Sequence, residues 1–348
     1  MDFLVKRDAM DELRFDDSAP PAAREGEALL AVRSFGLTAN NVSYAVLGDA
    51  LSYWDFFPAP EGWGRIPVWG FADVVASNTA LPEDTRVYGY LPPSSHLIVR
   101  PEQIDERGFA DASPHRSSLP AVYNRYTRTE ADALYDAAFE DEMILFRPLF
   151  LTSFLIDDFL ARNEFFGAEA VILSSASSKT ALGVAFLLSR REGISAVGVT
   201  SPQRRDFVEG TGVYEQVLAY GDLDSLPAGR AVYADLSGDA EVREAIHRHY
   251  GDRLAHSAMI GATHKDKLDG ANDDLPGPAP KFFFAPDHIP PGGGGLGGVA
   301  DAWHPFVDWA HGWLEVVHGR GPEAVERAYR ELLEGRVGSA TGHVLSLE

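Results

Sequence analysis

The sequence predicts an α/β protein with two domains, one rich in β-strands and one built on a parallel, doubly wound sheet. Three observations indicate this fold. Short strand-like runs interrupted by Pro and Gly occupy the first 100 residues, and strands alternate with helices from residue 169 to 285. The length of 348 residues and the apolar fraction of 45% suit two domains with a core each.

The N-terminal part has the pattern of a compact barrel or sandwich. Runs of apolar and β-branched residues predict strands over residues 27–35, 68–76, 85–90 and 96–100. Pro and Gly between these runs mark tight turns. From about residue 120 apolar residues recur at helical spacing, which predicts helices over residues 130–140 and 152–163.

The central part alternates between strands and helices. Strands are expected at 170–173, 196–199, 216–220, 231–235, 256–260 and 281–285, with helices at 179–191, 203–210 and 239–250. Because parallel strands need a crossover connection, this order predicts a doubly wound sheet of the Rossmann type. The chain then ends with expected helices over 300–318 and 322–334 and a strand over 343–347.

Composition excludes several classes of function. The formal net charge of −22 argues against nucleic acid and anionic membranes as partners, because like charges repel. Since the chain has no cysteine, disulfides and thiolate-bound zinc are excluded. The N-terminus lacks the apolar segment of a signal peptide, and no apolar run is long enough to span a bilayer. We therefore expect a cytoplasmic protein without a metal site.

The turn after the first central strand is where a dinucleotide site places glycines, which let the backbone approach the pyrophosphate. Residues 174–181 read Ser-Ser-Ala-Ser-Ser-Lys-Thr-Ala instead. Hydroxyls and a lysine at a helix N-terminus can still hold a phosphate. The cofactor candidates here are Ser175, Ser177, Ser178, Lys179 and Thr180. The alternative is a serine-capped helix in a fold that has lost its ligand.

The turn after the second strand indicates which dinucleotide would bind. An NAD site places an acid here for the ribose 2′-hydroxyl, whereas a 2′-phosphate favours hydroxyls and arginine. Residues 200–205 read Thr-Ser-Pro-Gln-Arg-Arg. Ser201, Arg204 and Arg205 therefore predict NADP. The alternative is a solvated arginine pair at the start of a helix.

Several stretches, in order along the chain, resemble the medium-chain dehydrogenase/reductase superfamily. Residues 67–74, 85–90 and 95–99 resemble its β-domain motifs, and residues 328–335 with 342–345 resemble its C-terminus. Thr152 stands where the superfamily has a threonine before the Rossmann unit, and Tyr220 stands where a tyrosine ends its third strand. The chain resembles the zinc-free, quinone-reductase-like branch and, most closely, the domain-of-unknown-function 2855 family.

The resemblance implies a GroES-like catalytic domain, residues 1–148 and 291–348, around a Rossmann nucleotide-binding domain, residues 149–290. It also implies a homodimer and NADP(H)-dependent, metal-independent hydride transfer to a small-molecule substrate, an enone, quinone or related carbonyl compound. Thr152 and Tyr220 join the cofactor candidates on this ground. The chain departs from the pattern at the glycine turn and at residues 38–41, Thr-Ala-Asn-Asn, where the family has an aspartate.

Reduction of an enone needs a hydrogen-bond donor at the carbonyl oxygen. Related reductases carry a tyrosine in the region 40–54, so Tyr44 is the first catalytic candidate, Tyr53 the second, and Asn41 an amide donor beside them. The alternative is that these aromatic residues belong to the core. Residues 123–126, Tyr-Asn-Arg-Tyr, are further candidates for lining the substrate cleft.

The remaining polar motifs favour structural roles. His304, His311 and His318 recur every seventh residue, so on one helix neighbours would stand about 10 Å apart, too far to share a metal. His247 and His249 are expected on the surface. The glycine run at 292–298 is either a mobile loop near the nicotinamide or a linker.

Two functional hypotheses follow from these patterns. The first is an NADP(H)-dependent reductase, which the second turn and the amide and tyrosine residues support. The second is a non-catalytic, dinucleotide- or small-molecule-binding pseudoenzyme that keeps the fold, which the altered glycine turn supports.

Overall fold

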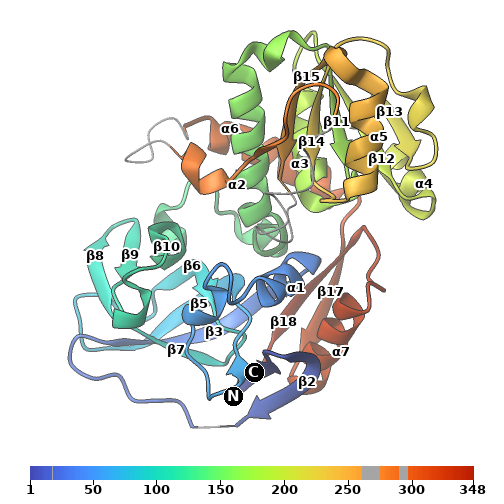
Figure 1. Ribbon diagram of the computed structural model, residues 1–348. Helices are drawn as coiled ribbons and strands as arrows, with labels where there is room; N and C mark the ends of the chain where they lie inside the picture. Colours follow the sequence, from blue (N-terminus) through green and yellow to red (C-terminus); the bar gives the residue numbers. More distant parts are fainter. Residues whose placement is uncertain (18, 261–274, 290–296) are drawn as a thin grey trace. The chain divides into compact units, whose positions relative to one another are not determined.

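A computed structural model describes residues 1–17, 19–260, 275–289 and 297–348. They form two compact units: unit 1 is Met1–Leu145 with Leu314–Glu348, and unit 2 is Phe146–Trp313. One is rich in β-strands and the other has a parallel sheet, as the sequence predicts (Figure 1). The expected bounds of the catalytic domain, 1–148 with 291–348, and of the nucleotide-binding domain, 149–290, stay a prediction.

Unit 1 is organised around a nine-stranded sheet of order β17-β18-β3-β5-β6-β10-β9-β8, with β7 paired to β3. A smaller sheet has the order β2-β1-β4. The strands are β1 (Asp2–Lys6), β2 (Ala9–Asp16), β3 (Ala28–Leu37), β4 (Trp63–Gly64), β5 (Val68–Ser77), β6 (Arg86–Leu91), β7 (His96–Val99), β8 (Pro101–Asp105), β9 (Gly108–Asp111), β10 (Arg125–Arg128), β17 (Glu315–Arg320) and β18 (Thr341–Ser346). Its α-helices include α1 (Ala39–Val46) and α7 (Pro322–Leu333), and α7 connects the parallel strands β17 and β18.

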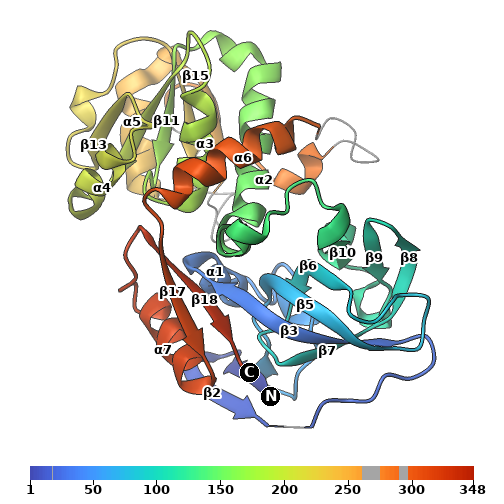
Figure 2. The same ribbon diagram turned by 180° about the vertical axis from the view of Figure 1, so that it is seen from behind.

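Unit 2 contains a six-stranded sheet of order β13-β12-β11-β14-β15-β16 in which every pair is parallel. Its strands are β11 (Ala170–Ser174), β12 (Ser195–Thr200), β13 (Gln216–Ala219), β14 (Ala231–Asp235), β15 (Leu254–Met259) and β16 (Lys281–Phe282). Among its described residues the α-helices are α2 (Glu140–Arg162), which begins in unit 1, α3 (Lys179–Leu188), α4 (Arg205–Gly210), α5 (Ala240–Tyr250) and α6 (Gly297–His311). Helix α5 covers one face of the sheet, and α3 and α6 cover the other (Figures 1 and 2).

The centre of the parallel sheet is buried on both faces. Every residue of β11 and of β14 is buried, as are the eight residues 181–188 of α3. Strands covered on both faces read as continuous apolar runs, which is why the sequence predicts them so closely. Gly183 of α3 lets α2 approach, because a Cβ there would lie 2.5 Å from the Ser153 Oγ.

Two helix predictions are wrong. Residues 130–140 form short 3₁₀ turns, because Asp132 and Asp136 accept hydrogen bonds from the backbone N–H groups of Leu134 and Ala138. The expected helix 300–318 ends at His311, and its last part is strand β17. Pairing with β18 favours the strand, since Val316 and Val317 are β-branched.

Candidate functional site

The ends of β11 and β14 define the candidate cofactor site. These two strands are neighbours in the sheet, although β12 and β13 lie between them in the sequence. After β11 the chain adds β12 and β13 on one side of that strand. It then returns to the other side of β11, where β14, β15 and β16 follow in order. Ligands of doubly wound sheets bind beyond the carboxyl ends of the strands at such a switch point.

The first turn is bent at Ser175, which has the positive φ of 50° that glycine adopts without strain. Its backbone N–H donates to the Tyr220 hydroxyl at 3.1 Å. The Ser178 hydroxyl accepts a hydrogen bond from the Ala181 N–H and caps α3. Thus the turn keeps the bend of a glycine turn, and Tyr220 holds it in place.

The second turn sends its two arginines to different partners. The Arg204 Nη1 lies 3.4 Å from the Ser177 Oγ, so this side chain joins the second turn to the first. The Arg205 Nε donates to the Glu209 carboxylate at 2.8 Å along helix α4. Ser201 precedes the 3₁₀ turn that carries Arg204. The structure therefore brings the side chains of Arg204 and Ser177 together, keeps Ser201 beside the Arg204 backbone, and leaves Arg205 engaged on its own helix.

Lys179 lies at the first position of α3, with its Nζ 5.9 Å from the centre of the Phe146 ring. Burial lowers the pKa of this lysine to about 8, and the positive charge of Arg204 acts in the same direction. Two cations that repel each other at a helix N-terminus favour a bound anion, because the anion offsets both charges.

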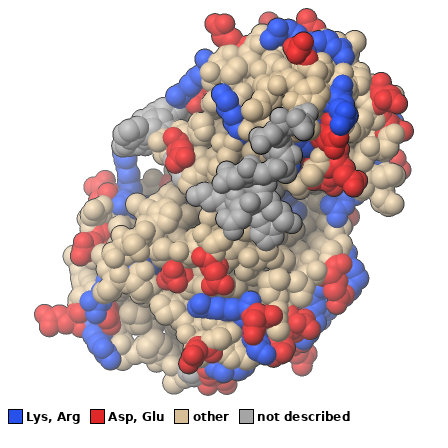
Figure 3. All heavy atoms as spheres, in the orientation of Figure 1, with Lys and Arg blue, Asp and Glu red and all other residues tan. Residues whose placement is uncertain are grey.

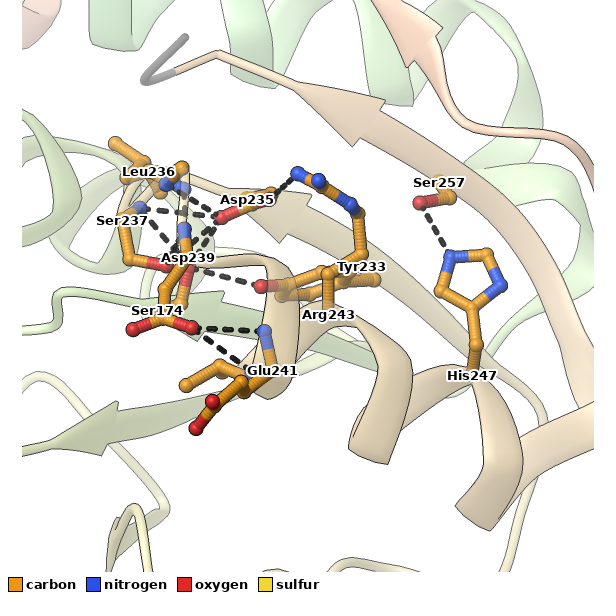
Figure 4. A network of polar contacts seen from close by, with 12 residues as sticks. Ser174, Tyr233, Asp235, Leu236, Ser237, Asp239, Glu241, Arg243, His247 and Ser257 are labelled. Atoms are coloured by element: carbon orange, nitrogen blue, oxygen red, sulfur yellow. Dashed lines mark hydrogen bonds and ion pairs between the residues drawn. The ribbon is translucent and has the colours of Figure 1, made fainter. Parts of the chain in front are cut away.

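A buried polar network joins the ends of β11 and β14 (Figure 4). Asp235 is fully buried, and its Oδ1 accepts hydrogen bonds from the Ser174 Oγ at 3.0 Å and from the Ser237 and Gly238 N–H groups. Its Oδ2 accepts from the Arg243 Nη1 at 2.8 Å. The loop after β14 is thereby fixed to the first turn.

Ser174 is the second centre of this network. Its Oγ accepts hydrogen bonds from the Tyr233 hydroxyl and from the N–H groups of Leu236 and Ser237. Sequence reasoning includes Ser174 in the first turn but misses Asp235 and its pairing with Ser174. A signal was present, because an acid that ends an otherwise apolar strand needs a partner.

The other two cofactor candidates, Thr152 and Thr180, have partners within or between helices α2 and α3. The Thr152 Oγ1 donates to the Pro148 carbonyl at 3.4 Å within α2. The Thr180 carbonyl accepts from the Ser153 hydroxyl at 2.8 Å, which links α2 to α3. These contacts support the helices that carry the first turn.

Unit 1 contains a cluster of four tyrosines, Tyr44, Tyr53, Tyr90 and Tyr123, which we call the tyrosine cluster. The ring centres of Tyr44 and Tyr53 are 4.4 Å apart, and those of Tyr90 and Tyr123 are 4.8 Å apart. The hydroxyls of Tyr53 and Tyr123 hydrogen-bond to each other. Burial raises the pKa of all four phenols above the ordinary value, so each carries its proton at neutral pH.

Two polar side chains, Asn41 and Arg116, fix the backbone segments next to the tyrosine cluster. The Asn41 Oδ1 accepts from the Thr38 N–H at 2.8 Å and its Nδ2 donates to the Pro67 carbonyl, so this amide fixes the start of α1. Arg116 is buried, pairs with Asp111 at 2.9 Å and donates to the carbonyl of Tyr123. The predicted segment 123–126 thus contributes Tyr123 to the cluster and Tyr126 as a partner of Arg116.

The structure confirms some of the histidine predictions and corrects others. His247 is fully buried, with its ring nitrogens 3.0 Å from the Pro276 carbonyl and the Ser257 Oγ (Figure 4), so its surface prediction is wrong. His304, His311 and His318 are exposed, but His318 lies on β17 rather than on a helix. In the described parts of the chain no three His, Asp or Glu side chains gather closely enough to hold a metal ion.

Acidic and basic side chains are interspersed over the face shown in Figure 3. No helix among the described residues is long and apolar enough to cross a membrane. The predicted homodimer stays a prediction, as does the expected absence of a nucleic-acid partner. Of the glycine run, residues 292–296 lie outside the described residues, and Gly297 and Gly298 begin α6.

Replacing Asp235 by Asn should destabilise the protein by roughly 3 kcal/mol, because the buried Arg243 loses its counter-charge. The matched control is Asp239→Asn, four residues later. Asp239 caps α5 through the Glu241 and Val242 N–H groups, and asparagine caps as well as aspartate, so little change is expected. Urea unfolding of both variants measures the difference, and equal losses would contradict the assigned role of Asp235.

The fold is similar to that of several solved structures. The chain superposes on the crystal structure of CurA in complex with NADPH from Vibrio vulnificus with a TM-score of 0.58 at 15% identity, covering 97% of this chain and 94% of that chain. It matches the quinone oxidoreductase from Coxiella burnetii with a TM-score of 0.58 at 12% identity, covering 100% and 99%. For the quinone oxidoreductase from Thermus thermophilus, described with its NADPH complex, the values are 0.52, 17%, 99% and 99%.

These likenesses confirm the predicted fold class, a GroES-like β-rich unit plus a Rossmann unit. No curated protein matches the chain. The model of the family described as "Protein of unknown function (DUF2855)" matches residues 35–338, which confirms the predicted resemblance. The chain belongs to this family.

Proposed function

We propose that this member of the DUF2855 family is an NADPH-dependent reductase that transfers a hydride to an enone, a quinone or a related carbonyl compound. The observation that carries the proposal is the pair of cations at the carboxyl edge of the parallel sheet, Lys179 and Arg204. Arg204 reaches the first turn at Ser177, and Lys179 is partly desolvated beside it. The likeness to folds described with NADPH supports the same conclusion.

The choice of NADPH over NADH rests on the second turn. Ser201 and Arg204 offer a hydroxyl and a guanidinium, which suit a 2′-phosphate, and no acid stands there for a ribose diol. Ser177, Ser178, Lys179 and Thr180 would hold the remaining phosphates at the start of α3. Arg205 would act as an outer cation, while Thr152 and Tyr220 position the helix and the turn.

The tyrosine cluster supplies the polar chemistry of the proposed reaction. When bound, NADPH supplies the hydride. Tyr44, or Tyr53 as the second choice, would donate a hydrogen bond to the substrate carbonyl oxygen, where negative charge develops during reduction. Their raised pKa keeps both phenols protonated for this task. Asn41 would act as a positioning residue, because it fixes the start of the helix that carries Tyr44.

One observation favours the second candidate function, a non-catalytic dinucleotide- or small-molecule-binding protein. The N–H of Ser175 and the N–H groups of the loop after β14 are bonded to oxygen atoms of the protein itself. A ligand at this edge would receive fewer backbone hydrogen bonds than in a glycine turn. Cofactor affinity would then depend on the side-chain cations.

Arg204→Ala should weaken NADPH binding about 10- to 100-fold, because a hydrogen bond to a charged group contributes roughly 1.5–3 kcal/mol. NADH binding should change little. The control is Arg205→Ala, which removes the same charge from a side chain already paired with Glu209. Fluorescence titration with both dinucleotides measures the effect. If both variants lost NADPH equally, or Arg204→Ala lost NADH equally, the NADP assignment would fail.

NADPH affinity should fall as the pH rises through about 8, the pKa of Lys179, because the neutral lysine no longer attracts phosphate. Well below that pH the lysine is fully charged, so its titration no longer changes the affinity for NADPH. Binding constants measured from about pH 7 to 9.5 should follow a one-proton transition. The Lys179→Met variant should bind more weakly at neutral pH and show no such transition; an unchanged pH profile in this variant would exclude Lys179.

Tyr44→Phe should lower kcat for NADPH oxidation about 100-fold in the presence of an active enone or quinone, while NADPH affinity stays the same. Tyr53→Phe tests the second choice. Tyr135→Phe is the control, because its hydroxyl binds Glu140 outside the tyrosine cluster. A thermal shift with NADPH but no turnover over an enone and quinone panel would favour the non-catalytic function, and no shift with NADPH or NADH would reject both.

A further inference from the structure

A cavity of about 300 Å³ lies within unit 1 beside helix α7. Its walls come from β17, α7, the turn at 336–338 and β18, so none of the proposed cofactor or catalytic residues lines it. The residues that matter for its chemistry are Ala324, Arg327, Ala328, Glu331, His343 and Leu345. A volume at the lower end of ligand pockets suits a small molecule.

Small side chains line one side of this space. Ala324 and Ala328 lie one turn apart on the face of α7 that meets the cavity. On β17 opposite them, Gly319 is required by packing, since a Cβ there would lie 2.7 Å from the Leu345 Cδ2 and 2.9 Å from the Ala324 Cβ. The alanine methyl groups form an apolar strip in a lining that is otherwise largely polar, and this strip can contact a short hydrocarbon chain.

Charged groups stand at the edges of the same space. Arg327 is exposed, and among the described residues no hydrogen bond or ion pair engages its guanidinium. The neighbouring Arg330 and Arg336 are paired with Glu326 and Glu334. Arg327 is therefore the lining cation that a ligand can use. Along α7, Glu331 follows one turn later.

Glu331 and His343 supply a second polar point in the cavity. The Glu331 Oε2 lies 3.7 Å from the Nε2 of His343, which is buried on β18. A carboxylate beside an imidazole can accept from and donate to one hydroxyl or amino group. The cavity thus offers a cation, the apolar surface of two alanines and a mixed donor–acceptor group.

We propose that this cavity binds a small organic carboxylate with a short, polar-substituted chain, a hydroxy acid for example. The guanidinium of Arg327 would take the carboxylate with two parallel hydrogen bonds, a geometry that planar guanidinium groups favour. The alanine surface would cover the carbon chain, and Glu331 with His343 would bind its substituent. The site is separate from the proposed reductase function and does not depend on it.

The net charge of the chain distinguishes binding in this cavity from weak anion binding elsewhere on the surface. With a formal net charge of −22, the protein repels anions on average, so weak anion binding by the general surface is not expected. Saturable binding of a carboxylate would need a local cation in a concave site. Arg327 in the cavity meets that requirement.

Ligand-observed NMR and calorimetry with lactate, malate, succinate and inorganic phosphate test the proposal on the full chain. We expect saturable binding of at least one carboxylate in the millimolar range or tighter, with inorganic phosphate weaker. Arg327→Ala should weaken this binding about tenfold or more. Because Arg327 is exposed, the variant should keep the unfolding temperature of the native chain.

Arg320→Ala is the matched control, since Arg320 is an exposed arginine of β17 that does not line the cavity. It should bind carboxylates as the native protein does. Arg327→Lys keeps the charge but loses the planar fork and should bind with intermediate affinity. The proposal is overturned if no carboxylate saturates, if phosphate binds more tightly, or if Arg320→Ala and Arg327→Ala weaken binding equally. NADPH binding is unaffected by either result.

Discussion

The hydrogen bond between Ser174 and the buried carboxylate of Asp235 is the constraint on which the rest of unit 2's site depends. It spans the two strands that flank the switch point of the sheet, at 3.0 Å between side-chain oxygens. A buried carboxylate is tolerated only when its charge is paired and its oxygens accept hydrogen bonds. Arg243 and the N–H groups of Ser237 and Gly238 meet that requirement.

This arrangement affects how the proposed cofactor site would hold an anion. In a glycine turn the backbone N–H groups face the ligand, whereas here Tyr220, Ser174 and Asp235 accept several of them. The positive charge then has to come from side chains. Lys179 and Arg204 supply it locally in a chain whose formal net charge is −22, because a nearby cation outweighs distant, screened acids.

The sequence predicts the parallel unit well because its signals are local. Strand β14 has the bounds 231–235 that its apolar run indicates, and α5 begins one residue after its cap, Asp239. The sequence does not predict which side chains pair at the site, since Ser174 and Asp235 are 61 residues apart. The different partners of Arg204 and Arg205 could have been predicted from the sequence. Glu209 stands four residues after Arg205, and on a helix this spacing favours an ion pair between them.

The errors arise where distant contacts or side-chain hydrogen bonds override local spacing. Strand β17 forms only because β18, which follows the whole of α7, pairs with it. His247 is buried because both ring nitrogens find partners, which no spacing of histidines reveals. The tyrosines show why core and site were hard to separate by sequence. Tyr44 packs as a core residue yet keeps a protonated hydroxyl, so burial itself makes it a suitable donor.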